Sequence, residues 1–529
     1  MTSAWWKRGT IYQIYPRSFQ DSNGDGIGDL PGVIARLDYL AWLGIDAIWL
    51  SPFYPSPMAD FGYDVSDYCD VDPIFGTLSD FDRLVKEAHA RSIKVIVDFV
   101  PNHTSAEHPW FVESRASGDN PKRDWFIWRD PAIDGGPPNN WLSEFGGPAW
   151  TKDAATGQYY YHAYLPQQPD LNWRHPDVHA AMLEALTFWL ERGVDGFRLD
   201  TVHHLFEDEG LRDNPPNPLF TAGMPPTQAL NRMHQYDQPE AQDVLRDFRR
   251  LTDSFSTAGA ERILVGEAYL PLDRIMAYYG EGKGVHLPFN FQLIGAPWDA
   301  GVLAGLISRY ESLLPAGGWP NWVLGNHDRS RVASRFGADA APLAAMLLLT
   351  LRGTPTFYYG DELGMTDVPV PPDLVQDPWE KRVPGFGLGR DPVRSPMPWD
   401  NSPGAGFSSG TPWLPLNADF DHRNVAALQS GKNNILLLTR DLLTLRKAEA
   451  ALHVGDYGLV ENRSDLLIYE RIHDTRRLMI MLNMSASAQQ TPVPDYELLL
   501  STHRDRAGEL GEKLLRLRPQ EGVVLRIRD

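Results

Sequence analysis

The chain has 529 residues, of which 43% are hydrophobic and 22% are charged, and this is the composition of an ordinary globular protein with a sizeable core. Its formal net charge of −20 argues against a phosphate-binding surface for nucleic acid, and no apolar stretch reaches the roughly 18 residues of a membrane span. The N-terminal sequence lacks the layout of a secretory signal, and the single cysteine, Cys69, cannot form an internal disulfide. We therefore expect a cytoplasmic protein without nucleic-acid or membrane partners, and the oligomeric state stays open.

Eight short runs rich in β-branched and aromatic residues predict buried strands, and helical patterns separate them. Residues 30–43 and 178–192, for example, carry apolar side chains at helical spacing and end before Gly44 and Gly193. Eight strand–helix units predict a parallel (β/α)₈ barrel whose active site lies at the carboxyl ends of the strands. The predicted strands are 10–15, 45–51, 93–99, 194–199, 262–266, 284–290, 321–325 and 354–359, of which 284–290 has the weakest pattern.

Two segments depart from this alternation. Residues 105–170 are rich in Gly, Pro, Trp and Tyr, and the tryptophans between 110 and 150 suit core packing and flat sugar-binding faces equally well. Residues from about 452 onward alternate like antiparallel strands. The predicted fold class is therefore α/β, a (β/α)₈ TIM barrel (1–104 and 171–451) with an inserted loop-rich domain after strand 3 (105–170) and a C-terminal antiparallel β domain (452–529).

Polar side chains gather where four of the predicted strands end. They are Asp98, Asn102 and His103 in DFVPNH, Arg198 and Asp200 in GFRLD, Glu267 in VGEAY, and His327 and Asp328 in GNHDR. Any one of them could be a structural residue in an ion pair, and for Asp98 we expect this role. Together, at the same end of a parallel barrel, they predict one acidic active-site bowl.

This set of side chains suits the hydrolysis of a glycosidic bond with retention. That reaction needs a carboxylate nucleophile and a carboxylic acid about 5–5.5 Å apart. Arg198 lies two residues before Asp200 on the same strand face, so its charge can lower the pKa of Asp200 and keep it ionised. Burial and a neighbouring carboxylate would raise the pKa of Glu267, and Asp328 could support positive charge in the transition state.

The segments DFVPNH, GFRLDTV, GEAY and GNHDRSR resemble the four signature regions of the α-amylase family of glycoside hydrolases, and QPDLNW resembles its fifth. The match runs from residue 5 to about 450. WWKRGTIYQIYPRSFQDSNGDGIGDL and GRDPVRSPMPW resemble the α-glucosidase and oligo-1,6-glucosidase branch. The resemblance implies Asp200 as nucleophile, Glu267 as acid/base and Asp328 as transition-state stabiliser. It also implies Asp60, Tyr63, His103, Arg198, His327 and Arg394 around the terminal glucose, with Arg390 close to Arg394.

A second candidate site lies in DSNGDGIGDL. The candidate metal ligands lie at every second position of this segment: the side chains of Asp21, Asn23, Asp25 and Asp29, and the backbone carbonyl of Ile27. The spacing resembles the first half of an EF-hand loop, but the twelfth position is Gly32 and not Glu, so the segment is not an EF-hand. An acidic turn that caps the next helix is the alternative. The family resemblance favours a structural Ca²⁺ or Mg²⁺ remote from the chemistry, and we expect no organic cofactor.

The function expected from these features is a retaining α-glucosidase that acts on short oligosaccharides, with possible transglucosylation. An oligo-1,6-glucosidase, or a sucrose-acting isomerase or glucosyltransferase, would share every catalytic residue named above and remains the alternative. A non-enzymatic amylase-like subunit would predict a membrane span and eroded carboxylates, and the chain has neither.

The linkage preference is predicted from Thr201, the residue after the proposed nucleophile. In related enzymes a valine at this position is associated with α-1,6 bonds, and threonine or alanine with α-1,4 bonds. Strand alternation predicts that the Thr201 side chain points away from Asp200, although at the end of the strand it could still border the aglycone sugar. We therefore expect α-1,4 cleavage, as in maltose; the alternative is that Thr201 is an ordinary strand-forming residue.

Overall fold

The computed structural model describes residues 4–463 and 465–528, and it confirms the predicted parallel barrel. The strands follow the order β10-β11-β1-β2-β3-β7-β8-β9, and a parallel bridge between Asn290 and Trp322 joins the two ends. All eight predicted strands are present, including the weakest, although β9 has only two residues. Their bounds are β1 (Ile11–Ile14), β2 (Ala47–Leu50), β3 (Lys94–Phe99), β7 (Gly196–Leu199), β8 (Ile263–Gly266), β9 (Leu287–Pro288), β10 (Asn321–Val323) and β11 (Thr354–Tyr358).

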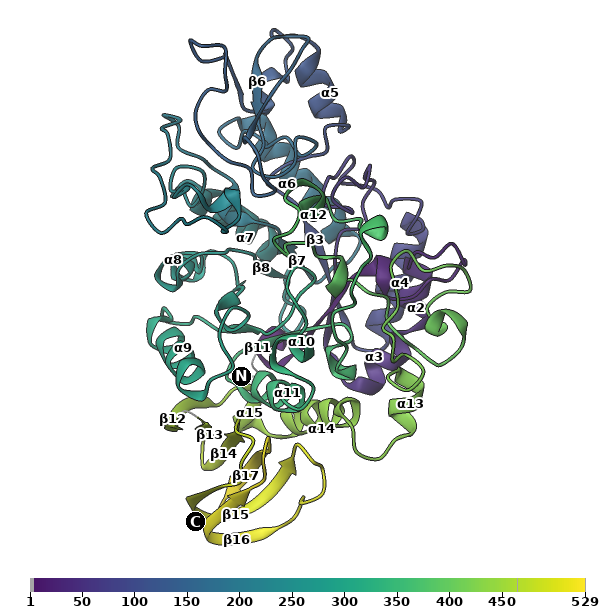
Figure 1. The fold of residues 1–529 in the computed structure, drawn as a ribbon, viewed down its shortest axis with the longest axis vertical. Coiled ribbons are helices and arrows are strands. Elements are labelled where there is room, and N and C mark those ends of the chain that lie inside the picture. Colours follow the sequence, from purple (N-terminus) through teal and green to yellow (C-terminus); the bar gives the residue numbers. More distant parts are fainter. Residues whose placement is uncertain (1–3, 464, 529) are drawn as a thin grey trace.

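The helices surround the barrel and cover its strands (Figure 1). The helix predicted at 178–192 is α6, which is followed by Gly193 in the left-handed conformation. The helix predicted at 30–43 is divided at Arg36, whose ψ of 3° leaves the helical range. The helices are α1 (Trp5–Arg8), α2 (Leu30–Ala35), α3 (Leu37–Leu43), α4 (Leu78–Ala90), α5 (Pro109–Ala116), α6 (Pro176–Glu191), α7 (Ala241–Ser254), α8 (Leu272–Ala277), α9 (Ala300–Leu313), α10 (Val332–Phe336), α11 (Ala341–Thr350), α12 (Pro378–Arg382), α13 (Val425–Ser430), α14 (Ile435–Ala448) and α15 (Ala450–His453).

Between β3 and α6 the chain leaves the barrel and forms α5 and a three-stranded sheet at one end of the molecule (Figure 1). Trp128, Trp141 and Trp150 of this segment are buried, and none of its five tryptophans lines the cavity described below. Core packing is therefore the role of these rings. The strands are β4 (Trp128–Arg129), β5 (Trp150–Lys152) and β6 (Tyr159–Tyr161).

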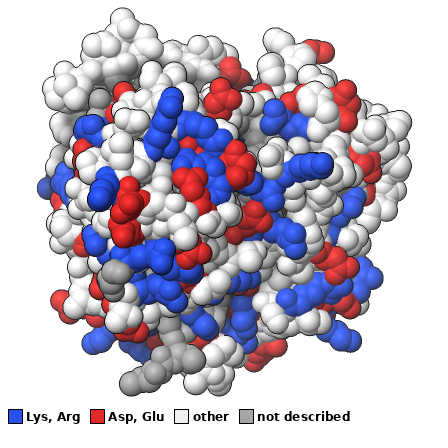
Figure 2. Space-filling model, turned by 90° about the horizontal axis from the view of Figure 1, so that it is seen from below, with Lys and Arg blue, Asp and Glu red and all other residues white. Residues whose placement is uncertain are grey.

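The C-terminal segment forms the expected antiparallel sheet, at the opposite end of the molecule from the inserted segment (Figure 1). Its strands follow the order β12-β13-β14-β17-β15-β16, and seen from this end the molecule carries basic and acidic side chains next to one another (Figure 2). The bounds are β12 (Asp456–Arg463), β13 (Leu466–His473), β14 (Arg476–Asn483), β15 (Gln489–Ser501), β16 (Leu510–Leu517) and β17 (Gly522–Ile527).

Two buried arginines lie where this sheet meets the barrel, and one of them, Arg471, belongs to the sheet. Arg471 of β13 donates from Nη1 to the carbonyls of Thr350 and Leu452, at 2.6 and 2.7 Å. Arg446 of α14 donates from Nη1 to the carbonyl of Leu349 at 3.0 Å and to further carbonyls nearby. Both guanidinium groups therefore satisfy carbonyls that helix α11 leaves unpaired at its C-terminus. Burial lowers the pKa of Arg446 to about 10 and that of Arg471 to about 9.

Among the residues that the structure describes, no helix combines the length and the apolar character needed to cross a bilayer.

Candidate active site

The polar residues predicted at the strand ends come together at the carboxyl end of the barrel. The register of β3 against β7 pairs Asp98 with Arg198, and β8 continues the sheet on the other side of β7. A cavity of about 320 Å³ opens above these strands. Its walls include all three predicted catalytic carboxyls and most of the predicted substrate-binding side chains, namely Asp60, Tyr63, His103, Asp200, Thr201, Glu267, His327 and Asp328.

Arg198 is buried beneath this cavity and holds three acidic side chains. Its Nη1 donates to Asp98 Oδ1 at 2.8 Å and to Asp200 Oδ1 at 2.6 Å, while its Nη2 lies 2.5 Å from Glu267 Oε2. Burial alone would lower the pKa of Arg198, but Asp98, Glu267 and Asp200 raise it well above its ordinary value. Because Asp200 and Glu267 bind the two terminal nitrogens of one guanidinium, their carboxyl groups lie close to one another.

Thr201 lies beside Asp200, and the predicted orientation of its side chain is wrong. Strand β7 ends at Leu199, so strand alternation no longer applies two residues later. Thr201 has φ 40° and ψ 45°, and its hydroxyl donates to Asp200 Oδ2 at 3.1 Å. A left-handed conformation costs a β-branched residue about 1–3 kcal/mol, and such strain is typically stored at functional sites. The same turn directs the Thr201 N–H toward Glu267 Oε2, at 3.1 Å.

The surroundings of Glu267 favour its protonated form. Burial raises its pKa well above the ordinary value, and the carboxylates of Asp200 and Asp328 raise it further, although Arg198 opposes them. Only 2% of the residue is exposed, so water cannot screen these charges. The arrangement places a carboxyl group whose protonated form is favoured beside the carboxyl group of Asp200, as general acid catalysis requires.

Asp328 is held in the ionised form by cationic neighbours. Burial would raise its pKa, but His327, Arg390 and Arg394 lower it below the ordinary value. Burial lowers the pKa of His327 to about 3, so at neutral pH the two guanidinium groups are the charged neighbours. Arg394 Nη2 lies 3.0 Å and Arg390 Nη1 lies 3.6 Å from Asp328 Oδ1.

The two arginines have different positions, and only one of them faces the cavity. Arg390 lines the wall and its Nη2 lies 2.6 Å from Asp60 Oδ1 and 2.9 Å from Asp377 Oδ1. Arg394 is fully buried behind Asp328, where its Nε donates to the His327 carbonyl at 2.9 Å. The structure therefore assigns to Arg390 the place beside the cavity that the sequence analysis gave to Arg394. The two were hard to separate in the sequence because they are four residues apart in one irregular loop.

Two neutral imidazoles are fixed by amide and hydroxyl partners. The Gln13 amide donates to His327 Nδ1, so His327 Nε2 carries the hydrogen and donates to the Tyr63 hydroxyl; both distances are 2.7 Å, and the His327 ring is stacked on Tyr63. Burial lowers the pKa of His103 to about 4, and its Nε2 lies 3.1 Å from the amide nitrogen of Gln168. Gln168 also donates to Asp60 Oδ2 at 3.2 Å. The sequence analysis quoted the segment QPDLNW but did not identify its first residue, Gln168, as a member of the site.

The wall of the cavity includes an ion pair that the sequence analysis missed. Glu144 of the inserted segment binds Arg232, which belongs to the long loop between β7 and α7. His204, from the start of the same loop, lies 3.7 Å from Glu144. No local motif could reveal this pair, because its members are 88 residues apart and meet only when the loop packs on the inserted segment.

The loop from Asp21 to Asp29 folds as a tight acidic turn. Asp21 accepts the N–H groups of Asn23, Gly24 and Gly26, and Asp25 accepts that of Ile27 at 2.8 Å. Asp29 caps helix α2 by accepting the N–H of Gly32. Hydrogen bonds to the loop engage the acidic oxygens that a cation would need, and no cluster of three or more acidic, histidine or cysteine side chains is arranged to hold a metal among residues 4–463 and 465–528. A cation bound in this loop would take the place of some of these hydrogen bonds.

A parallel barrel whose carboxyl end holds a glutamic acid and an aspartate on one arginine, with the pKa of the glutamic acid raised, is the arrangement expected of glycoside-cleaving enzymes. The comparison with known families agrees, since the alpha amylase catalytic domain matches residues 13–455. The chain therefore belongs to the α-amylase family of glycoside hydrolases.

Individual proteins that resemble this chain have glucosidase or glucosyl-transfer names. A probable alpha-glucosidase of Rhizobium meliloti is 45% identical over 504 residues, which cover 93% of this chain and 91% of that protein. An oligo-1,6-glucosidase of Parageobacillus thermoglucosidasius is 38% identical, with 100% of both chains covered. Among solved structures, the alpha-glucosyl transfer enzyme XgtA superposes with a TM-score of 0.93 at 40% identity, again over 100% of both chains.

The raised pKa of Glu267 predicts the alkaline limb of the pH profile. Catalysis needs the protonated acid, so kcat/KM should be maintained below this pKa and lost as the pH rises through it. Since Asp328 is one of the charges that raise the pKa, Asp328→Asn should move the alkaline limb to lower pH, in addition to lowering the rate. Measuring kcat/KM against pH for both proteins tests this, and an unmoved limb would assign the ionisation to another group.

Proposed function

We propose that this protein is a retaining α-glucosidase that releases terminal α-linked glucose from short oligosaccharides. One observation carries the proposal: a single buried guanidinium, that of Arg198, binds both Asp200 and Glu267. Retention requires two carboxyl groups close enough for one to attack the sugar while the other protonates the leaving group. A cavity of about 320 Å³ has room for a short sugar, which supports action on short oligosaccharides.

In the proposed mechanism, Asp200 attacks the anomeric carbon while Glu267 donates its proton to the glycosidic oxygen, and the aglycone leaves. This forms a glucosyl ester on Asp200. Glu267, now ionised, then takes a proton from a water molecule, which attacks the same carbon and releases glucose with regeneration of Asp200 and the protonated acid. Asp328, kept ionised by its guanidinium neighbours, stabilises positive charge on the ring in both transition states.

Replacing either partner should stop the chemical step. Asp200→Asn removes the nucleophilic charge and Glu267→Gln removes the proton, so each variant should lose several orders of magnitude in kcat on maltose while its melting temperature stays close to that of the wild type. A glucoside with a good leaving group needs no proton donor, so the Glu267→Gln protein should accumulate an adduct that mass spectrometry locates on Asp200. Either variant retaining a tenth of the wild-type turnover would contradict the assignment.

We infer an α-1,4 preference from the contact between Thr201 and Asp200. The hydroxyl donates to the carboxylate, and Thr201 also lines the cavity wall where the second sugar would lie. Valine has nearly the same shape but cannot donate this hydrogen bond. The expected outcome is that maltose is cleaved better than isomaltose.

Thr201→Val should narrow or reverse that preference. The ratio of kcat/KM for maltose to that for isomaltose should change by about 1–3 kcal/mol, the scale of one pocket contact. Thr201→Ser keeps the hydroxyl and should retain the wild-type preference, which makes it the matched control. If the wild type prefers isomaltose, or if the valine variant keeps the ratio, the interpretation of Thr201 is wrong while the α-glucosidase proposal stands.

The second candidate function, an α-1,6-specific or glucosyl-transferring enzyme, is supported by the likeness to relatives with those names. It uses the same two-step chemistry and differs in the acceptor that resolves the glucosyl enzyme. Product analysis on maltose, isomaltose, sucrose and maltotriose separates the candidates, because a hydrolase releases free glucose whereas a transferase or sucrose isomerase yields new disaccharides or longer sugars.

We further propose that the loop from Asp21 to Asp29 binds a structural divalent cation, Ca²⁺ or Mg²⁺. Its side chains and the Ile27 carbonyl offer only oxygen donors, which hard cations prefer. Removal of the metal by a chelator should lower the melting temperature, and added Ca²⁺ or Mg²⁺ should restore it, because a cation that binds only the native state stabilises that state. Catalysis at low temperature should change little. An unchanged melting temperature, in protein shown by elemental analysis to have lost its metal, would identify the loop as an acidic turn.

A further inference from the structure

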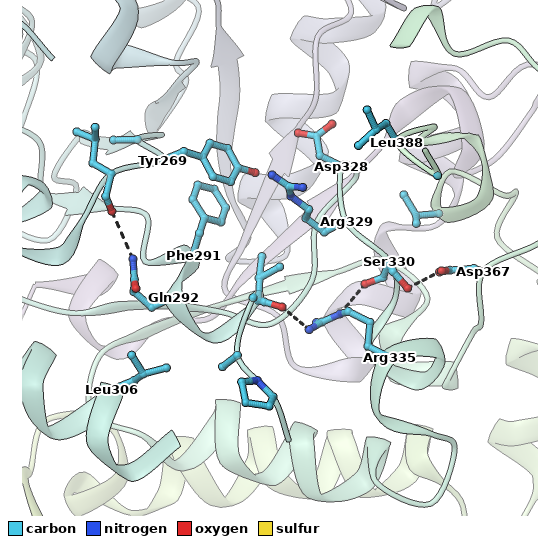
Figure 3. A pocket seen from close by; sticks show the side chains of 18 of the residues that line it. Tyr269, Phe291, Gln292, Leu306, Asp328, Arg329, Ser330, Arg335, Asp367 and Leu388 are labelled. Atoms are coloured by element: carbon cyan, nitrogen blue, oxygen red, sulfur yellow. Dashed lines mark hydrogen bonds between the residues drawn. The ribbon is translucent and has the colours of Figure 1, made fainter. Parts of the chain in front are cut away.

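Asp328 has different surroundings on its two sides. On one side a second cavity, of about 1020 Å³, shares Asp328 with the catalytic cavity, and Figure 3 shows the carboxyl group beside Arg329 in its wall. On the other side lies His327, which lines the catalytic cavity alone. His327 Nε2 lies 3.5 Å from Asp328 Oδ1. The groups that orient the His327 ring therefore also determine what the Asp328 carboxylate faces.

The His327 ring is enclosed between two aromatic rings. It is stacked on Tyr63, with the planes 2° from parallel, and on Tyr15, with a ring-centroid distance of 5.9 Å. The charged groups near it are Asp328, Arg394, Arg198 and Arg390. Because burial keeps the ring neutral at neutral pH, it carries one hydrogen, on either Nδ1 or Nε2.

Gln13 of strand β1 selects between these two forms. Its side chain is fully buried, and its amide nitrogen lies 2.7 Å from His327 Nδ1 and 3.2 Å from Ser51 Oγ. An amide nitrogen only donates, and it has two N–H groups for these two acceptors. His327 Nδ1 must therefore offer a lone pair, and the hydrogen of the ring lies on Nε2.

Tyr63 requires the same form from the opposite side of the ring. Its hydroxyl donates to Asp98 Oδ2 at 3.2 Å, so its oxygen accepts the hydrogen of His327 Nε2. The hydrogen bonds thus run in one direction from Gln13 through His327 and Tyr63 to Asp98. Such aligned hydrogen bonds strengthen one another in a buried site.

We propose that Gln13 is a positioning residue that keeps the hydrogen of His327 on Nε2, so that an N–H and not a lone pair lies beside Asp328. This role rests on the retaining α-glucosidase function proposed above, in which Asp328 stabilises the transition state. A lone pair at this distance would repel the carboxylate, whereas the N–H stabilises its charge.

Gln13→Met tests the hydrogen bond without adding charge. Methionine has a similar length but no N–H, so Nδ1 loses its donor and the hydrogen is no longer confined to Nε2. We expect kcat/KM on maltose to fall about tenfold, the scale of one hydrogen bond, with the pH profile unmoved. Ser51→Ala is the matched control, since it removes the other partner of Gln13 and should keep the wild-type kcat/KM. Wild-type kcat/KM in folded Gln13→Met protein, or an equal fall in Ser51→Ala, would overturn the proposal.

Gln13→Glu gives a readout that a merely structural role would not move. The introduced carboxyl group and His327 share a proton, and Nε2 keeps its hydrogen while the pair holds that proton, whichever partner carries it. When the proton is lost, the carboxylate takes the hydrogen of the ring to Nδ1 and leaves Nε2 bare.

The alkaline limb of kcat/KM should therefore move to lower pH in Gln13→Glu, because the three nearby guanidinium groups disfavour a further proton on the pair. A charge effect alone would act in the opposite direction, since an added carboxylate raises the pKa of Glu267 and moves the limb to higher pH. A limb that stays in place or moves to higher pH would contradict the role given to Gln13.

Nuclear magnetic resonance on the wild type tests the proposal independently of how the variants fold. With ¹⁵N-labelled histidine, the two ring nitrogens differ in chemical shift according to which one carries the hydrogen, and His327→Asn identifies the signals by their loss. We expect the hydrogen on Nε2 at neutral pH, and a hydrogen on Nδ1 would overturn the proposal. Failure of the wild type to cleave maltose would instead reject the α-glucosidase function, which this spectrum does not depend on.

Discussion

The organisation of the catalytic end depends on one buried cation, Arg198, and on the three carboxyl groups that it holds. A guanidinium offers its donors in a fixed plane, so it can orient several carboxyl groups at once, which a flexible lysine cannot do. Three acidic groups buried together would repel one another strongly without it. Its position on β7, paired in register with Asp98 of β3, makes the geometry of the site a property of the barrel itself rather than of the loops above it.

The charges around the cavity give two of its carboxyl groups different protonation preferences. Burial and the carboxylates of Asp200 and Asp328 raise the pKa of Glu267 and favour its protonated form, whereas guanidinium groups lower the pKa of Asp328 and keep it ionised. Thr201 links Glu267 to Asp200, the two carboxyl groups proposed to react, since its backbone contacts Glu267 and its hydroxyl contacts Asp200. Its left-handed conformation is the local distortion that allows both contacts, and it explains why a β-branched residue is found where the backbone disfavours one.

The sequence predicted the barrel because the apolar runs of its strands are local features, and every predicted strand is present. The strand-end carboxyls were equally predictable, because parallel strands direct their carboxyl ends to the same face. Three features could not be predicted in this way. Thr201 lies beyond the last strand residue, Arg390 and Arg394 share one irregular loop, and Glu144 meets Arg232 only through the packing of two long loops. Each depends on backbone geometry that no residue pattern encodes.

The arginines at the base of the barrel have a consequence for how the molecule unfolds. Arg471 of β13 donates to the carbonyls of Thr350 at the end of α11 and Leu452 in α15, so it joins the first hairpin of the C-terminal sheet to these helices. Arg446 of α14 binds carbonyls from the same region and fixes the helix ends that Arg471 contacts. Separating the sheet would leave the Thr350 carbonyl without this donor and expose a cation that has no carboxylate partner among those bonds. The C-terminal sheet and the barrel are distinct in architecture, but this cost favours their unfolding together.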